Sequence, residues 1–168
     1  MIIVFGIGNP GKKYEGTRHN VGSMILKELE RFNLKDVVLV RPTTFMNESG
    51  KAVKEIIKNY KLKIENLIVI HDDIDLLLGK IKIVKNRGSA GHKGVESIIR
   101  EIRTKNFIRF RIGIQPKKGK PKNVEKFVLQ DFNKEEKKVL KEGVKKAILA
   151  MKLVITKGLE RAIGEFNQ

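Results

Sequence analysis

His19 is the first residue in this sequence that could carry acid–base chemistry. It lies in the segment Thr17-Arg18-His19-Asn20, directly before an apolar pattern with helical spacing that begins at Val21. The positive end of a helix dipole favours a neutral imidazole, and a neutral imidazole is what a general base needs at pH 7. A lone histidine is more often a cap or a surface residue, so a catalytic role for His19 requires a partner.

A partner for His19 is offered by the segment His71-Asp72-Asp73-Ile74-Asp75, which follows the apolar run Leu67–Ile70. One of its carboxylates could accept the second N–H of the imidazole and orient the ring, as in a catalytic triad. The carboxylates could instead bind Mg²⁺ through oxygen ligands, with His19 and His92 nearby, which would make a metal-dependent phosphoesterase. An acidic turn that contains one helix cap is the simplest alternative.

Three further segments hold polar or small residues at places where ligands often bind. Gly6-Ile7-Gly8-Asn9-Pro10-Gly11 satisfies the dinucleotide pattern G-x-G-x-x-G, but no helical pattern starts at its last glycine, so a tight turn is favoured. In Arg41–Gly50, Asn47 or Ser49 could cap the next helix, or the Asn47 amide could hold a substrate carbonyl. Arg87–Gly94 precedes a helix, where free backbone N–H groups could bind an anion and Lys93 would add charge.

The elements that must position these residues follow from hydrophobic periodicity. Short apolar runs predict strands, and apolar residues three and four positions apart predict helices. The predicted strands are Met1–Phe5, Val37–Val40, Leu67–Ile70, Ile81–Val84 and Phe107–Ile114, and the predicted helices are Val21–Phe32, Ala52–Tyr60, Val95–Ile102 and Val139–Ile155. This alternation predicts one α/β domain over residues 1–168 with a largely parallel sheet, and such sheets collect their sites at the carboxyl ends of strands. In the last predicted strand, Arg109 and Arg111 alternate with isoleucine and phenylalanine, which predicts a basic face.

The charge of the chain favours a polyanionic partner. The 168 residues include 36 Lys and Arg against 19 Asp and Glu, a net charge of +17, and residues 100–168 carry +11 of it. Eight basic residues and only one acidic residue, Glu125, lie between Lys105 and Lys126. Such a field attracts phosphates, although a solvated lysine-rich surface would look similar. The chain has no cysteine, no apolar run of the roughly 18 residues that a membrane span needs, and no signal-peptide pattern, so we expect a cytoplasmic protein.

The motifs together resemble the bacterial-type peptidyl-tRNA hydrolases. The resemblance covers almost the whole chain and rests on the following segments: Gly8-Asn9-Pro10-Gly11 with Tyr14, Thr17-Arg18-His19-Asn20, Pro42-Thr43-Thr44-Phe45-Met46-Asn47-Glu48-Ser49-Gly50, His71-Asp72-Asp73-Ile74-Asp75, Ser89-Ala90-Gly91-His92-Lys93-Gly94, Phe110-Arg111-Ile112-Gly113-Ile114 and Phe127-Val128-Leu129. The Pro-Thr-Thr-Phe-Met-Asn and Thr-Arg-His-Asn stretches are distinctive of that family.

The resemblance implies hydrolysis of the ester between a peptide and the 3′ ribose of tRNA, by a monomeric, cytoplasmic enzyme that uses no metal or other cofactor. It implies one mixed, mostly parallel twisted sheet wrapped by helices. By motif, His19 matches the catalytic base, Asp72 the carboxylate that orients it, and Asn9 the residue that separates N-blocked from free aminoacyl esters. The residues expected to contact peptide or tRNA are Tyr14, Phe45, Met46, Asn47, His92, Lys93, Arg111, Lys82 and Lys85, with Arg109 and the lysines at 117–122 as further candidates for phosphates.

Two features depart from the family pattern. Lys93 stands where many relatives carry an asparagine, so it could donate to the substrate or contact a phosphate. The chain also runs from Phe32 to Val37 with almost nothing between, where relatives often have an extra strand pair, so one edge of the sheet is expected to be trimmed. A non-catalytic RNA-binding module is the remaining alternative, and it rests on the charge alone.

Overall fold

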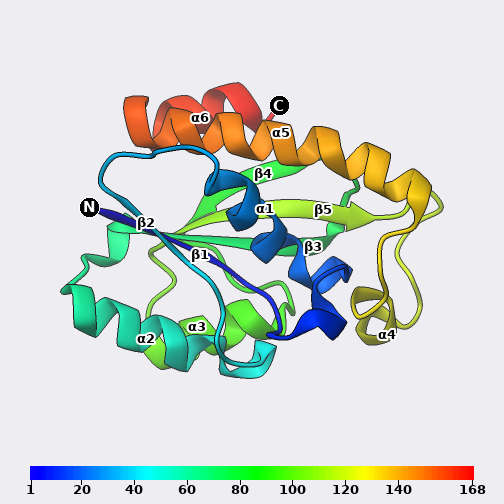
Figure 1. Cartoon of the computed structure of the whole chain (residues 1–168), viewed down its shortest axis with the longest axis horizontal. Coiled ribbons are helices and arrows are strands. Elements are labelled where there is room, and N and C mark those ends of the chain that lie inside the picture. Colours follow the sequence, from blue (N-terminus) through cyan, green and yellow to red (C-terminus); the bar gives the residue numbers. More distant parts are fainter.

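A computed structural model describes all residues 1–168 as a five-stranded sheet between two layers of helices (Figure 1). The strands are β1 (Ile2–Gly6), β2 (Val37–Val40), β3 (Leu67–Leu77), β4 (Ile81–Lys85) and β5 (Ile108–Gln115). The helices are α1 (Val21–Leu29), α2 (Ser49–Tyr60), α3 (Lys93–Ile102), α4 (Val124–Val128), α5 (Lys134–Lys157) and α6 (Leu159–Phe166). Four short 3₁₀ turns complete the fold: η1 (Lys12–Tyr14), η2 (Arg18–Asn20), η3 (Met46–Glu48) and η4 (Ile64–Asn66).

The strand order β2-β1-β3-β5-β4 confirms the predicted mostly parallel sheet. β1, β2, β3 and β5 run parallel, and only the edge strand β4 is antiparallel to its neighbour β5. β2 forms the opposite edge, and residues 30–36 connect α1 to it without another strand, as the short link predicted.

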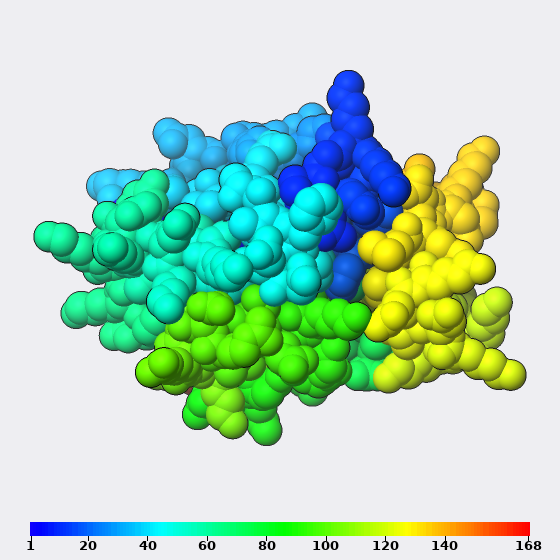
Figure 2. All heavy atoms as spheres, turned by 90° about the horizontal axis from the view of Figure 1, so that it is seen from below, coloured from blue at the N-terminus to red at the C-terminus, as the bar shows by residue number.

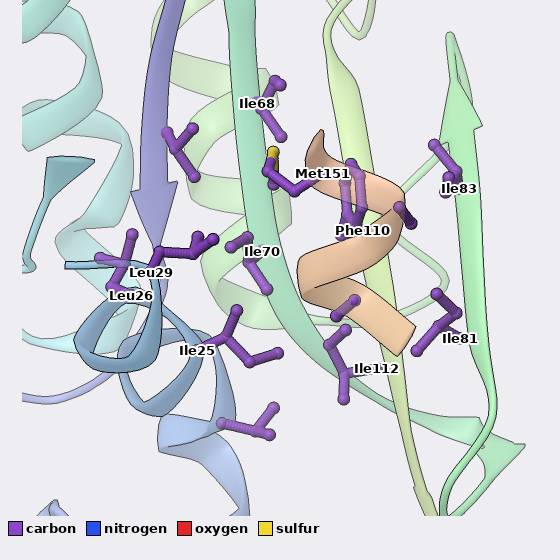
Figure 3. Packing of buried hydrophobic residues seen from close by; sticks show 14 of the residues in the cluster. Ile25, Leu26, Leu29, Ile68, Ile70, Ile81, Ile83, Phe110, Ile112 and Met151 are labelled. Atoms are coloured by element: carbon purple, nitrogen blue, oxygen red, sulfur yellow. The ribbon is translucent and has the colours of Figure 1, made fainter. Parts of the chain in front are cut away.

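Helices on both faces explain why the central strands are apolar at nearly every position. Alternate residues such as Val4 and Ile70 face α1 and α5, where they join a core cluster of 21 buried residues (Figure 3). Residues between them, such as Phe5 and Val69, face α2 and α3 in a second cluster of 12.

The main difference from the predicted elements lies in β3. The sequence places the end of this strand at Ile70, whereas β3 continues through the acidic segment to Leu77. Its partner β5 pairs with it residue by residue from Ile68 to Asp73, so the ladder extends past the apolar run. The short helices α4 and α6 were also not predicted, and α1 ends at Leu29 rather than at Phe32.

Glycines let the loop after β1 approach α1 closely. A Cβ on Gly22 would lie 2.3 Å from the carbonyl oxygen of Ile70, and one on Gly6 would lie 2.5 Å from the carbonyl oxygen of Gly22. Larger residues would therefore push α1 away from the sheet. Of the glycines in the dinucleotide pattern, Gly6 and Gly8 thus allow close packing, whereas Gly11 has a positive φ of 101°. The chain after Gly11 enters the turn η1 rather than a phosphate-binding helix.

Candidate active site

Asp72 binds two histidines that reach it from different elements. His19, in η2 just before α1, places Nδ1 at 2.8 Å from Asp72 Oδ2. His92, at the start of α3, places Nε2 at 2.7 Å from Asp72 Oδ1. The two imidazole rings lie 5.0 Å apart, between their centroids. The fold therefore brings together the predicted pair His19 and Asp72, and it adds His92 to the same carboxylate.

Hydrogen bonds define which nitrogen of each ring carries the proton. His92 Nδ1 accepts the backbone N–H groups of Gly94 and Val95, at 3.1 and 3.2 Å, and so must be unprotonated. The proton of a neutral His92 then lies on Nε2 and is donated to Asp72. His19 likewise donates Nδ1–H to Asp72, which leaves its Nε2 with a free lone pair. This is the tautomer that a general base requires.

Asp72 stays ionised in this environment. Burial alone would raise the pKa of the Asp72 carboxyl, but the charges and hydrogen bonds of His19 and His92 outweigh burial and lower that pKa well below its usual range. A carboxyl group with a lowered pKa stabilises the fold at neutral pH, and this contribution is lost only as the pH falls towards the lowered value. Asp72 can therefore stabilise an imidazolium on His19 throughout the neutral range.

Asn9 is held rigidly beside the two histidines. Its backbone N–H donates to Asn20 Oδ1 at 2.8 Å, and Asn20 Nδ2 donates to the Asn9 carbonyl at 2.9 Å. The backbone N–H of Met46 donates to Asn9 Oδ1 at 2.8 Å. Because Asn9 Oδ1 accepts this hydrogen bond, the Nδ2 group of the same side chain remains to donate to a ligand in the cavity that Asn9 lines. Asn20, which the sequence did not single out, thus supports a candidate site residue.

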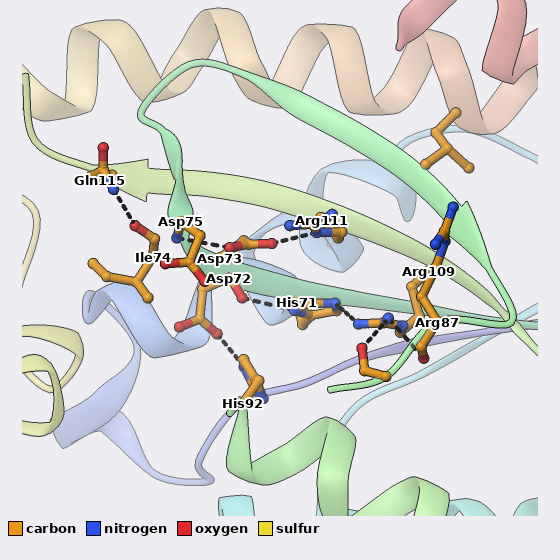
Figure 4. Close-up of polar contacts among 12 residues, drawn as sticks. His71, Asp72, Asp73, Ile74, Asp75, Arg87, His92, Arg109, Arg111 and Gln115 are labelled. Atoms are coloured by element: carbon orange, nitrogen blue, oxygen red, sulfur yellow. Dashed lines mark hydrogen bonds and ion pairs between the residues drawn. The ribbon is translucent and has the colours of Figure 1, made fainter. Parts of the chain in front are cut away.

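Strand alternation separates the acidic groups that could have formed a metal site (Figure 4). Asp73 pairs with Arg111, and Asp75 pairs with Lys120 at 2.9 Å. The ring of His71 lies 4.9 Å from that of His92, between centroids, but both of its nitrogens form hydrogen bonds, one to the Asp72 carbonyl and the other to Arg109. Only His19, Asp72 and His92 have potential ligand atoms close enough together to bind one ion. The two carboxylate oxygens of Asp72 already accept hydrogen bonds from the two histidines. The geometry gives no support to a metal-dependent phosphoesterase.

Arg109 is buried, which corrects the prediction of an exposed basic face on β5. It is 3% exposed and donates to the carbonyls of Arg87 and Gly88 and to His71 Nε2, so it anchors the loop that leads to His92. Burial, followed by repulsion from Arg111, lowers the pKa of Arg109 to about 10, so it stays charged at neutral pH. Burial, with the charges of His92 and Arg109, holds the pKa of His71 well below its ordinary value.

Two predictions about helix starts are also corrected. Neither Asn47 nor Ser49 caps α2, because the Ser49 hydroxyl instead donates to the Met46 carbonyl at 2.7 Å. At α3, the free N–H groups that were expected to bind an anion are taken by the His92 ring.

Arg18 fastens the turn that carries His19 to the start of α5. Its guanidinium donates to both carboxylate oxygens of Glu136, at 3.0 and 2.8 Å, and to the carbonyl of Phe127 at 3.1 Å. It also lies 3.9 Å from the centroid of the Phe127 ring. This contact was not predictable from the sequence, because Arg18 and Glu136 are 118 positions apart and neither belongs to a recognisable pair.

Replacing Arg18 by alanine is expected to destabilise the protein by about 1.5–3 kcal/mol, since the half-buried Glu136 carboxylate loses its charged partner and keeps only the Asn133 N–H, while the Phe127 carbonyl loses a donor. Urea denaturation would measure the change. Arg31→Ala is the matched control, because it breaks an exposed ion pair with Glu28 and should cost no more than about 1 kcal/mol. Equal losses in the two variants would contradict the anchoring role of Arg18.

A cavity of about 1290 Å³ surrounds the histidine pair. Nearly all predicted site residues line it, namely Asn9, His19, Phe45, Met46, Asn47, Asp72, Lys82, Lys85, His92, Lys93 and Arg111. Tyr14 does not line it, but its ring stands edge-on to Phe45, with 6.2 Å between the ring centroids. The cavity exceeds the size of most small-molecule sites, so it suits an extended substrate.

Comparisons with known proteins point to one family. A family model described as peptidyl-tRNA hydrolase matches residues 3–35 and 28–168, and the two matches meet where α1 is followed directly by β2. The peptidyl-tRNA hydrolase of Thermodesulfovibrio yellowstonii is 42% identical over 188 residues and covers 100% of both chains. That of Aquifex aeolicus is also 42% identical, over 99% of this chain and 96% of its own. The crystal structure of the Acinetobacter baumannii peptidyl-tRNA hydrolase has a TM-score of 0.88 and 28% identity, covering 99% of this chain and 94% of its own. The chain therefore belongs to the peptidyl-tRNA hydrolase family.

Proposed function

We propose that this chain hydrolyses the ester bond between the C-terminus of a peptide and the 3′ ribose of tRNA, and that His19 and Asp72 carry the reaction. The assignment of residues rests on the imidazole of His19. Asp72 orients this ring, and its Nε2 has no hydrogen-bond partner in a large cavity that His19 lines. An ester is an activated acyl group, so water and a general base suffice without a protein nucleophile.

The base chemistry follows from the tautomer of His19. Nε2 takes a proton from a water molecule as the water oxygen bonds to the ester carbonyl carbon. Asp72 stabilises the imidazolium that forms, through the 2.8 Å contact with Nδ1–H. When the tetrahedral intermediate collapses, the bond to the ribose oxygen breaks, and the imidazolium returns the proton to that oxygen. Free tRNA and a peptide with a C-terminal carboxyl group are released.

We assign to Asn9 the binding of the carbonyl group that the reaction polarises. Its Nδ2 donors are oriented by the Met46 contact, and a fixed donor needs no reorganisation when charge develops. A rigid, buried amide also discriminates strongly between partners, because a mismatched group leaves it without a hydrogen bond. This would separate an N-blocked peptidyl ester from an ester with a free, charged amino group.

The cavity is lined by apolar residues in one part and by basic residues in another. Phe45, 53% exposed, and Met46 offer apolar surface, with Tyr14 packed against Phe45, which suits peptide side chains and the terminal base. Lys82 on β4 faces Arg111 on β5 in the strand register, and Lys85 continues the same edge. These cations suit backbone phosphates, which are present in every tRNA whatever its sequence.

Replacing Lys82 and Lys85 together by glutamine is expected to weaken tRNA binding and to raise KM. Neither lysine makes an ion pair in the structure, so the fold should survive, whereas Arg111 is needed by Asp73. The dependence of log affinity on log salt should become shallower by about 0.9 for each lost phosphate contact. Lys137→Gln with Lys141→Gln on α5 is the matched control, outside the cavity. A double variant that changes only turnover would contradict a phosphate-binding role.

The decisive test compares hydrolysis of N-acetylaminoacyl-tRNA with that of free aminoacyl-tRNA, for the wild type and His19→Ala. We expect rapid release of tRNA from the N-blocked substrate alone, with full activity in EDTA. Loss of activity in EDTA that Mg²⁺ or Zn²⁺ restores would refute metal-free hydrolysis. Binding of tRNA without any hydrolysis would favour an RNA-binding module instead.

We also infer that the protein acts as a cytoplasmic monomer without an obligate protein partner. The cavity lies within one chain and already contains the base, the orienting carboxylate and the amide donor. None of the helices has the length and apolar character that crossing a membrane requires. Sedimentation at the concentration used for activity would detect a larger assembly.

A further inference from the structure

An ion pair joins two walls of the cavity beside the histidines. Lys93 is the first residue of α3, and its Nζ lies 2.6 Å from Oε1 of Glu125 on α4. Both residues line the cavity, and their side chains are 62% and 76% exposed. Figure 2 shows this face of the molecule, where the green segment that contains Lys93 and the yellow segment that contains Glu125 adjoin.

Glu125 is an acidic residue in a strongly basic segment of the chain. It is the only acidic residue between Lys105 and Lys126, a segment that holds eight basic residues. The hydrogen bond and charge of Lys93 lower the pKa of the Glu125 carboxyl, so it stays ionised at neutral pH. Because water screens exposed ion pairs, this pair contributes little to stability and can be exchanged for another partner.

The wall that carries Glu125 is anchored independently of Lys93. Arg18 donates to the Phe127 carbonyl and stacks on the Phe127 ring, so the backbone of α4 is held from the His19 side. The N–H groups at the start of α3 are already bound by the His92 ring. If the Glu125 side chain rotates away, the Lys93 ammonium group therefore becomes available to bind an anion in the cavity.

The position of Lys93 indicates which anion would reach it. Lys93 follows His92, whose ring centre lies 5.0 Å from that of His19. A lysine side chain extends about 6 Å from its Cα by ordinary bond lengths. Lys93 and His19 line the same cavity, so an anion on Lys93 would lie in the space that receives the end of the substrate. In peptidyl-tRNA, the phosphodiester between the last two nucleotides is the nearest anion to that ester.

We propose that Lys93 binds this terminal phosphodiester and that Glu125 occupies Lys93 until the substrate replaces it. The inference rests on the proposed function and names the phosphate that Lys93 contacts and the carboxylate that competes with it. It is an exchange of ion-pair partners, in which no covalent bond changes. Glu125 therefore competes with the substrate, and its removal should strengthen binding of the RNA end.

The test measures binding of a fluorescein-labelled oligoribonucleotide that ends in CCA, a single-stranded probe without an ester. We expect Lys93→Gln to weaken binding about fivefold and to reduce the salt slope by about 0.7, as for one phosphate contact on a single strand. Glu125→Gln should tighten binding about threefold, in line with the strength of an exposed ion pair. Because it acts through Lys93, Glu125→Gln should have no effect in the Lys93→Gln background.

Glu142→Gln is the matched control for charge, since Glu142 forms a similarly exposed pair with Lys145 on α5, outside the cavity. Its affinity for the probe should stay close to that of the wild type. If Glu125→Gln behaves like Glu142→Gln, or weakens binding as Lys93→Gln does, the exchange is refuted. The proposed function is tested separately, because it fails only if the wild type does not hydrolyse N-acetylaminoacyl-tRNA.

Discussion

Replacing His19 by alanine is expected to lower kcat/KM for N-acetylaminoacyl-tRNA by about 10²- to 10⁴-fold, the usual contribution of a general base. The structure leaves Nε2 of His19 as the one ring nitrogen of the Asp72 pair without a partner, because Nδ1 and both nitrogens of His92 are engaged. The loss should fall on kcat, since the imidazole acts on water rather than holding the tRNA.

Measurements of tRNA binding and of stability would show whether the loss of activity in His19→Ala is a loss of catalysis alone. Affinity for deacylated tRNA should stay within about twofold of the wild type, because His19 is only 12% exposed and contacts between cations and phosphates are expected to hold the tRNA. Arg31→Ala, in the turn that follows α1, serves as the surface control for both assays. If His19→Ala kept most of its activity, another group would have to be the base.

Replacing Asp72 by asparagine is expected to give a loss of about 10²- to 10⁴-fold through the wrong tautomer of His19. The start of α3 keeps His92 in the tautomer with Nε2–H, which needs an acceptor. An asparagine has one acceptor oxygen, and we expect it to turn that oxygen towards His92. Its NH₂ group then faces His19, whose Nδ1 must accept, so the proton moves to Nε2 and the base is blocked.

This explanation predicts an unusual dependence on His92. In the Asp72→Asn background, removal of the His92 ring frees the amide to turn its oxygen to His19. His92→Ala should therefore cost less activity in that background than in the wild type, as a double-mutant cycle would show. Nitrogen NMR of the imidazoles would report the tautomer of His19 directly. A proton that stays on Nδ1 in Asp72→Asn would contradict the mechanism of this loss.

The strands and helices were largely predictable because they depend on local periodicity. The apolar run Val37–Val40 is a strand with those bounds, and the helical spacing around Val95–Ile102 lies within α3. The extension of β3 was not predictable from its own residues. Acidic residues disfavour a strand, and only the ladder with β5 and the cations Arg111 and Lys120 make Asp73 and Asp75 acceptable there.

The kind of chemistry at the candidate site was predictable from local motifs. Residue types at local spacings predicted His19 as the candidate base and a carboxylate of residues 71–75 as its partner, and the resemblance to a known family added Asp72 and Asn9 by motif. The excess of basic residues likewise predicted a polyanionic partner.

The pairing of those groups depends on how the chain folds. Asp72 binds His19 from 53 positions away and His92 from 20, and Arg109 became a buried anchor although its pattern predicted an exposed face. Hydrogen bonds and ion pairs depend on which strands and loops lie side by side. That arrangement is set by packing on both faces of the sheet, over separations that local patterns do not encode.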